Sequence, residues 1–257
     1  MKKYTSVMML YARSTICKLL GLLAVTGLAE VGLFYMSMSP ESSLEAVFSA
    51  SHLPLVCGVA FLLWTAVLII HPLQKSGYTL YRMQLRPVDL FLCHIIYNTC
   101  CYVLFWSFQA CLLLGLFHWY GAQANEAAYG PQSIMLAFYR TNFLHSLLPL
   151  ADWTRYVRNA FLALGLGTAA ALPLARQGSR SSLISLAVLA LAAVWSFPAS
   201  IGRTGADWTI VVISVLVVLW DICTIAAIET PLSSEDVPNT AAVSRQENEV
   251  NRNDTNQ

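Results

Sequence analysis

Charged residues are scarce in this chain. Only 11% of its 257 residues are Asp, Glu, Lys or Arg, whereas 57% are hydrophobic. Soluble domains usually carry about a quarter charged residues, so this composition indicates a protein that is buried in lipid. The formal net charge is only +1. That balance argues against a nucleic-acid-binding protein, because neutralising phosphates requires a clustered excess of Lys and Arg.

Motifs of the common enzyme classes are also missing. The chain has no Gly-x-x-x-x-Gly-Lys-Ser/Thr phosphate loop, no His-Glu-x-x-His pair and no Gly-x-Ser-x-Gly elbow. Its seven cysteines form no Cys-x-x-Cys pair and its five histidines are scattered, so neither a disulfide framework nor a metal site is indicated. We therefore predict that the chain is not an enzyme, with no catalytic residue, metal or cofactor of its own.

Long hydrophobic runs, by contrast, are abundant. An α-helix needs about 20 apolar residues to cross the hydrocarbon core of a bilayer. Six runs meet this length, at about 19–38, 52–71, 93–117, 158–175, 182–201 and 207–228. The predicted fold is an all-α integral membrane protein with a six-span transmembrane domain over residues 19–228.

Two flanking segments differ from the spans in composition. Residues 1–18 mix basic and apolar residues, which predicts an interfacial N-terminal helix. A cleaved signal peptide is the alternative, and its small-residue cleavage pattern is poor. Residues 229–257 are rich in Ser, Glu, Asn, Asp and Thr, which predicts a disordered cytoplasmic tail.

The basic residues predict the orientation. With the N-terminus inside, eleven of the fifteen Lys and Arg residues fall in cytoplasmic segments and four in outer segments. Cytoplasmic loops carry the excess of basic residues in membrane proteins. We therefore predict a multi-pass protein of the cell membrane with both termini cytoplasmic.

The predicted outer loop, residues 119–157, contains a moderately apolar piece at 134–150. Arg140, Asn142, His145 and Pro149 interrupt it. An arginine in the middle of a span would be expensive in lipid. We therefore predict a re-entrant or interfacial helix there. The alternative is a seventh crossing, which would place the C-terminal tail outside.

Polar side chains inside the spans are candidates for a substrate path. His94, Asn98 and Gln109 share one narrow stripe of the third span, and Glu30 lies in the middle of the first. Polar groups in hydrocarbon must find partners, so these side chains should face the bundle interior or a second subunit. The alternative is that they only hold helices together by hydrogen bonds.

Small residues recur every four positions in the fourth span, at Ala163, Gly167 and Ala171. Such spacing lets two helix backbones approach closely. We predict that this face packs tightly on a neighbouring helix or on a second copy of the chain.

The connection between the second and third spans, residues 72–92, combines basic residues with an apolar stripe. Lys75, Arg82 and Arg86 precede the first acid, Asp89, and Tyr78, Tyr81 and Leu85 lie among them. The pattern predicts a cytoplasmic, surface-lying helix that a partner can bind. A basic loop that only fixes the topology is the alternative.

This layout resembles the permease subunits of ABC-2-type transporters. The stretch Tyr78-Thr-Leu-Tyr-Arg-Met-Gln-Leu-Arg-Pro-Val-Asp89 is similar to the short helix and turn by which those permeases contact a separate ATPase. The resemblance implies that Tyr78, Tyr81, Arg82, Leu85, Arg86, Pro87 and Asp89 couple to an ATPase.

The resemblance also implies the partners and the setting. ATP would bind to the ATPase subunit and not to this chain, and a second permease subunit, identical or different, would complete the transporter in a bacterial inner membrane. Because the spans carry few charges, an amphipathic or peptide-like substrate is expected. Two alternatives stay open: a non-transporting scaffold, sensor or immunity protein that binds a partner, and a membrane-embedded enzyme.

Overall fold

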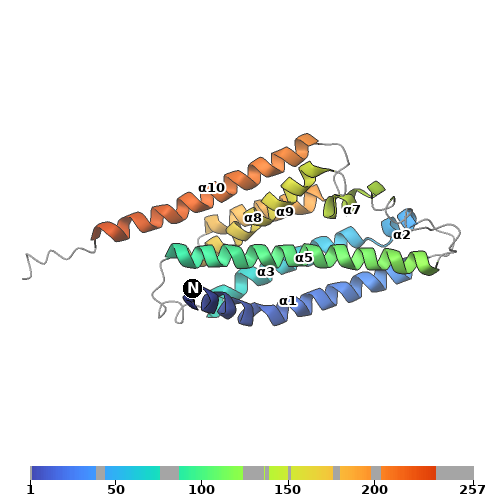
Figure 1. The fold of residues 1–257 in the computed structure, drawn as a ribbon, viewed down its shortest axis with the longest axis horizontal. Coiled ribbons are helices and arrows are strands. Elements are labelled where there is room, and N and C mark those ends of the chain that lie inside the picture. The colour runs from blue at the N-terminus through green and yellow to red at the C-terminus, as the bar shows by residue number, and fades with distance from the viewer. Residues whose placement is uncertain are drawn as a thin grey trace, which may run out of the picture. The chain divides into compact units, whose positions relative to one another are not determined.

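The structure is a computed structural model that describes residues 2–38, 44–75, 87–123, 136, 139–149, 152–175, 180–197 and 204–235. Its helices in chain order are α1 (Lys2–Ser37), α2 (Leu44–Ala50), α3 (Leu53–Lys75), α5 (Pro87–Gln123), α7 (Asn142–Leu147), α8 (Trp153–Ala175), α9 (Arg180–Ser196) and α10 (Thr204–Glu235) (Figure 1). No strand occurs among these residues, which confirms the all-α prediction for the described part of the chain.

The chain divides into two compact units, Met1–Asp221 and Ile222–Gln257. The first unit contains α1 to α9 and most of α10, and all the contacts below lie within it. Of the second unit, the described residues are the helical end of α10.

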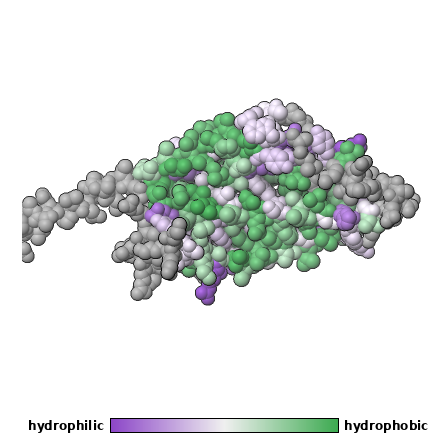
Figure 2. Space-filling view, in the orientation of Figure 1, coloured by the Kyte–Doolittle hydropathy of each residue, from purple (hydrophilic) through white to green (hydrophobic). Residues whose placement is uncertain are grey.

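Within the described ranges, four helices are long and apolar enough to cross a membrane, over Tyr4–Ser37, Leu53–Ile70, Val88–Ala122 and Thr204–Ala227. They coincide with the first, second, third and sixth predicted spans, so the membrane prediction is confirmed at this coarser level. The surface in view is mainly hydrophobic over α1 and α5, with hydrophilic residues toward its two ends (Figure 2). Such a band is what contact with hydrocarbon requires.

Two predicted boundaries differ from the structure. Residues 1–18 and the first span belong to one continuous helix, α1. α10 continues to Glu235, so the prediction of disorder from residue 229 is wrong for its first residues, and residues 236–257 lie outside the described residues. Extending a helix adds one hydrogen bond per residue, which explains why polar composition alone does not end it.

In the predicted outer loop, the structure places the short helix α7, whose six residues cannot cross a hydrocarbon core of about 30 Å. Its side chains from Phe143 to Leu147 are buried. α7 contacts α5, so it lies against the bundle.

Helix α5 packs against four other helices. It begins at Pro87, a residue well suited to the first turn because its missing N–H would have no partner there. It contacts α1, α3, α7 and α8. Trp64 of α3 and Phe105 and Phe117 of α5 are fully buried in the resulting core.

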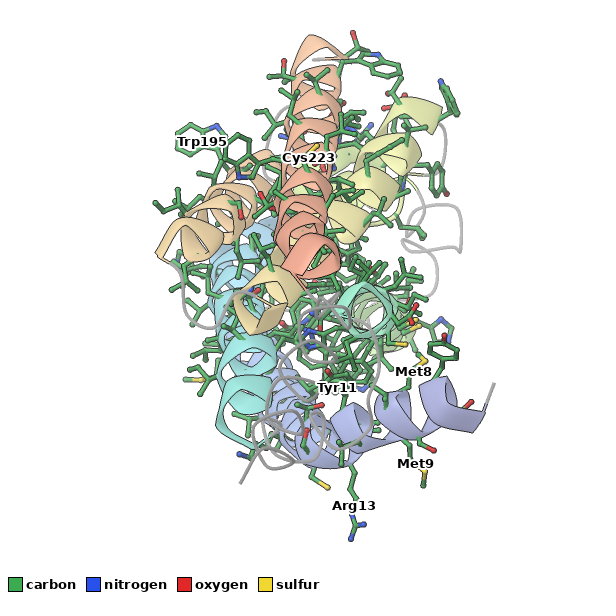
Figure 3. All side chains as sticks on the ribbon, turned by 90° about the vertical axis from the view of Figure 1, so that its left-hand side faces the viewer. Met8, Met9, Tyr11, Arg13, Trp195 and Cys223 are labelled. Carbon is green, nitrogen blue, oxygen red and sulfur yellow. The ribbon has the colours of Figure 1, made fainter. Side chains whose placement is uncertain are left out.

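The first half of α1 packs through one of its faces. Val7 and Tyr11, four residues apart, are buried with Cys93 of α5, whereas Met9 is exposed. Figure 3 shows Tyr11 pointing toward the other helices, with Met9 and Arg13 pointing away. This arrangement follows from the helical period, which places residues four apart on one face.

Candidate functional site

Two sets of buried or partly buried polar residues stand out in the first unit. The inner polar group consists of the four predicted path residues, Glu30, His94, Asn98 and Gln109. The end network consists of residues from α7, α8 and α10 and the residue before α8: His145, Ser146, Asp152, Arg155, Arg158, Asn159 and Asp207.

The inner polar group is inside the bundle. Glu30, Asn98 and Gln109 are 0% exposed and His94 is 1% exposed. Glu30 comes from α1, and the other three share one face of α5. The predicted stripe on the third span therefore faces other helices and not lipid.

The structure brings only some of these residues together. The Glu30 carboxyl lies near the Gln109 amide. The His94 ring stacks on Tyr11 of α1 with 4.7 Å between centroids, and it lies next to the Ala171 backbone of α8. His94 and Gln109 are fifteen residues apart, which is about 22 Å along a helix. The group is thus a line of polar sites along α5 and not one compact site.

Hydrogen bonds do not satisfy the inner polar group within the described part of the chain. The side-chain nitrogen and oxygen atoms of Asn98 and Gln109, both carboxyl oxygens of Glu30 and both ring nitrogens of His94 form none. Leaving a buried polar group without a hydrogen bond costs about 1–3 kcal/mol. Glu30 and Gln109 lie close to each other and His94 lies next to the Ala171 backbone, whereas no described residue is a hydrogen-bond partner of Asn98. Water, substrate or another subunit would therefore be needed most at Asn98.

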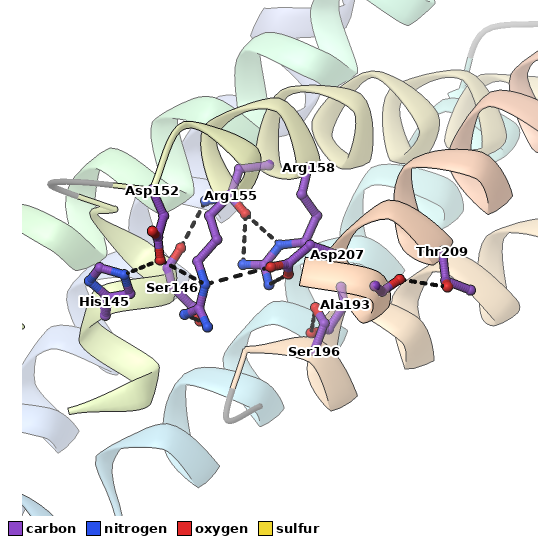
Figure 4. A network of polar contacts seen from close by, with 11 residues as sticks. His145, Ser146, Asp152, Arg155, Arg158, Ala193, Ser196, Asp207 and Thr209 are labelled. Carbon is purple, nitrogen blue, oxygen red and sulfur yellow. Dashed lines mark hydrogen bonds and ion pairs between the residues drawn. The ribbon is translucent and has the colours of Figure 1, made fainter. Parts of the chain in front are cut away.

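The end network is well satisfied by comparison (Figure 4). Arg158 donates from Nη1 to Asp207 Oδ1 at 2.7 Å and from Nη2 to Asn159 Oδ1 at 3.0 Å. Arg155 donates from Nη1 to Ser146 Oγ at 2.8 Å, and its Nε lies 3.7 Å from Asp207 Oδ2. These contacts tie the first turns of α8 and α10 to α7.

A histidine–carboxylate contact extends the network to the start of α8. His145 Nε2 lies 2.9 Å from Asp152 Oδ2, and His145 is 0% exposed. Asn159 Nδ2 donates to the Ser146 carbonyl at 2.8 Å. α7 is therefore held by its side chains and its backbone, which explains how so short a helix keeps a fixed place.

The two arginines of the network are unusually deep for charged residues. Arg155 is 2% exposed and Arg158 is 0% exposed, and the Arg158 guanidinium lies 5.5 Å from the centroid of the Phe197 ring. A buried cation requires a close anion and further hydrogen bonds. Asp207 supplies that anion from α10. The network therefore links α10 to α8, and the loss of one member would leave its partner buried without that contact.

No family model, curated protein or solved structure matches the chain. Its function must therefore be inferred from its own residues. In the described ranges, no group of three or more His, Cys, Asp or Glu side chains is arranged to hold a metal ion.

Most of the predicted ATPase-coupling residues lie outside the described residues, namely Tyr78, Tyr81, Arg82, Leu85 and Arg86. Of the other two, Pro87 is the first residue of α5 and Asp89 lies in its first turn. A negatively charged side chain at this position stabilises the helix, because the N-terminal end of the helix dipole is positive. The coupling role of all seven residues stays a prediction.

The predicted packing residues of α8 lie against neighbouring helices. Ala163 is 3% and Ala171 is 1% exposed. A Cβ atom added to Gly167 would lie 2.1 Å from Thr99 Oγ1 and 3.1 Å from the Thr99 backbone nitrogen of α5. The α5 and α8 backbones therefore approach so closely at this point that only glycine fits.

Sequence reasoning did not identify the end network. The charge distribution places Arg155 and Arg158 among the four basic residues of outer segments, and the sixth predicted span begins at residue 207. One signal was present: two arginines three residues apart share a helix face, directly before an apolar run. Such a pair requires an anion from elsewhere in the fold.

Proposed function

We propose that this chain is the membrane subunit of a transporter that a separate ATPase drives, and that it moves an amphipathic or peptide-like substrate. The observation that carries this proposal is the inner polar group. Glu30, His94, Asn98 and Gln109 are buried inside a bundle of apolar helices, yet their polar atoms form no hydrogen bonds within the described residues. Polar residues at such depth are expensive and mark substrate or ion pathways.

The arrangement of these residues suits an elongated substrate. His94, Asn98 and Gln109 are spread along α5 over about 22 Å, which is most of a hydrocarbon core of about 30 Å. A peptide or an amphiphile can exchange hydrogen bonds with successive side chains as it moves. The few charges in the spans make a bare ion a poorer candidate.

The proposal includes six crossings with both termini in the cytoplasm. α8 has 23 residues and α9 has 17, or about 35 Å and 26 Å. In this topology they form the fourth and fifth crossings, between α5 and α10. The distribution of Lys and Arg supports the orientation.

In this proposal, the ATPase contacts the chain at residues 72–92 and moves it there. Arg82 and Arg86 would pair with acids of the ATPase, while Tyr81 and Leu85 occupy an apolar groove. Closure of the ATPase on ATP would then displace the start of α5 at Pro87. Two permease subunits, identical or different, would enclose the path. Any coupling of this kind requires contacts that differ between the two states.

The partner interaction can be tested by co-purification of the intact protein from its native membrane. Exchanging Arg82 and Arg86 together for Glu is expected to reduce the co-purified ATPase about tenfold or more, which corresponds to the loss of about 1.4 kcal/mol of binding free energy. The ATPase is quantified by mass spectrometry. The matched control exchanges Arg176 and Arg180 for Glu, because this pair lies in another predicted cytoplasmic connection. If no ATPase co-purifies, or if both double variants behave alike, the proposal is wrong and the non-transporting alternative stands.

The substrate path can be tested separately in inverted vesicles, by ATP-dependent uptake of a fluorescent amphipathic peptide. Glu30→Gln and Asn98→Leu are expected to lower uptake about tenfold. Asn98→Leu is also expected to keep or raise the thermal stability, because it removes a buried polar group without a hydrogen bond. Lower stability with normal uptake would show that these residues only hold helices together.

A further inference from the structure

An apolar pocket of about 300 Å³ lies between α3, α5, α7 and α9. Pro54, Leu55 and Gly58 of α3 form one wall, and Phe105 and Trp106 of α5 form a second. Phe143 of α7 and Ala193 and Phe197 at the end of α9 complete it. None of the described residues that line the pocket carries a charged side chain. None of these residues belongs to the inner polar group or the end network.

The pocket runs from the surface into the core. Leu55 is 66% exposed and Trp106 is half-buried, whereas Phe105 and Ala193 are buried. The lining residues of α3 lie in the first turns of the candidate span Leu53–Ile70. An exposed leucine at that position contacts the bilayer, so the pocket opens toward lipid near one membrane surface.

We propose that this pocket binds one hydrocarbon chain of a membrane lipid or lipid-like amphiphile. The hydrocarbon layer outside the pocket consists of such chains. The aromatic and aliphatic lining can pack against a chain, and no polar group has to lose its water when the chain binds. The absence of charge from the lining excludes the headgroup, which stays at the membrane surface outside the pocket. This inference does not rest on the proposed transport function.

Occupancy would also affect the end network. Phe197 lines the pocket, and the Arg158 guanidinium lies 5.5 Å from the centroid of its ring. Phe143 lines the pocket from α7, and its neighbours His145 and Ser146 contact Asp152 and Arg155. A bound chain would therefore contact two aromatic side chains that are linked to the end network, Phe197 through Arg158 and Phe143 through its place on α7.

Trp106 provides the test. The purified protein in dodecylmaltoside is titrated with 11-bromoundecanoic acid, whose bromine quenches a tryptophan in contact with it. Subtracting the signal of Trp106→Phe isolates Trp106 from the other six tryptophans. We expect saturable quenching of Trp106. Gly58→Leu, which fills the pocket, is expected to raise the half-saturating concentration about tenfold, because excluding about two methylene groups has an effect of this size.

The matched control is Gly32→Leu on α1, where an added Cβ meets nothing within 4 Å. It is expected to leave the titration unchanged. If Gly58→Leu does not yield a monodisperse protein, Ala193→Leu fills the same pocket from α9. Quenching that rises linearly without saturation would overturn the proposal, since it would reflect simple partitioning into the micelle. Equal titrations for the pocket-filling variant and the control would overturn it as well.

Discussion

Replacing Asp207 with Asn is expected to lower the free energy of unfolding by about 3–5 kcal/mol, the usual effect of removing one partner from a buried ion pair. Asp207 accepts a hydrogen bond from Arg158 at 2.7 Å and lies 3.7 Å from the Nε atom of Arg155. Both arginines are almost fully buried. The substitution would remove the carboxylate that Arg158 contacts and would leave Arg155 with Asp152, whose Oδ2 atom lies 3.9 Å from its Nε atom. Thermal unfolding in detergent, followed by circular dichroism, measures the change.

Asp221→Asn is the matched control for Asp207→Asn. Asp221 is also a buried aspartate of α10, but its carboxyl oxygens form no hydrogen bond within the described residues. Asn at this position removes the cost of burying a carboxyl group and leaves no arginine without its partner. We therefore expect unchanged or higher thermal stability. Equal losses for the two variants would contradict the special role assigned to Asp207.

Replacing Gly167 with Ala is expected to destabilise the protein by about 1–3 kcal/mol, the usual range for overpacking. The added Cβ would lie 2.1 Å from Thr99 Oγ1 and 3.2 Å from the Ile95 carbonyl oxygen. Thr99 can rotate its side chain, but the backbone of α5 cannot yield without moving the whole helix. The midpoint of thermal unfolding reports the loss.

Two further variants separate overpacking from the general effect of exchanging glycine. Gly115→Ala, in α5, adds a Cβ with nothing within 4 Å, so it should be neutral or stabilise by up to about 1 kcal/mol. Adding Thr99→Ala to Gly167→Ala removes the shortest contact but keeps those with the backbone, so it should restore only part of the stability. A Gly167→Ala variant as stable as Gly115→Ala would show that α5 and α8 do not pack this closely.

The sequence predicted much of the helical layout because hydrophobic length is a strong local signal. The second span, predicted at 52–71, corresponds to α3 at Leu53–Lys75, and the third lies inside α5. The inward direction of His94, Asn98 and Gln109 also followed from the sequence, because the period of a helix fixes which residues share a face. The roles of these residues stay predictions.

The partners of these residues could not be predicted in the same way. Asp207 lies 49 positions after Arg158, and no local pattern indicates that the start of α10 meets the start of α8. The proximity of Glu30 to Gln109 depends likewise on how α1 packs on α5. Tertiary contacts of this kind arise from packing and not from composition.

The length of α5 has a mechanical consequence. Its 37 residues extend about 55 Å, well beyond a hydrocarbon layer of about 30 Å, and no proline interrupts it after Pro87. It begins within the predicted connection of residues 72–92 and is long enough to reach beyond the far side of such a layer. A force applied at Pro87 would therefore move α5 along its axis as one rigid helix. The buried amides of Asn98 and Gln109 would then be displaced together.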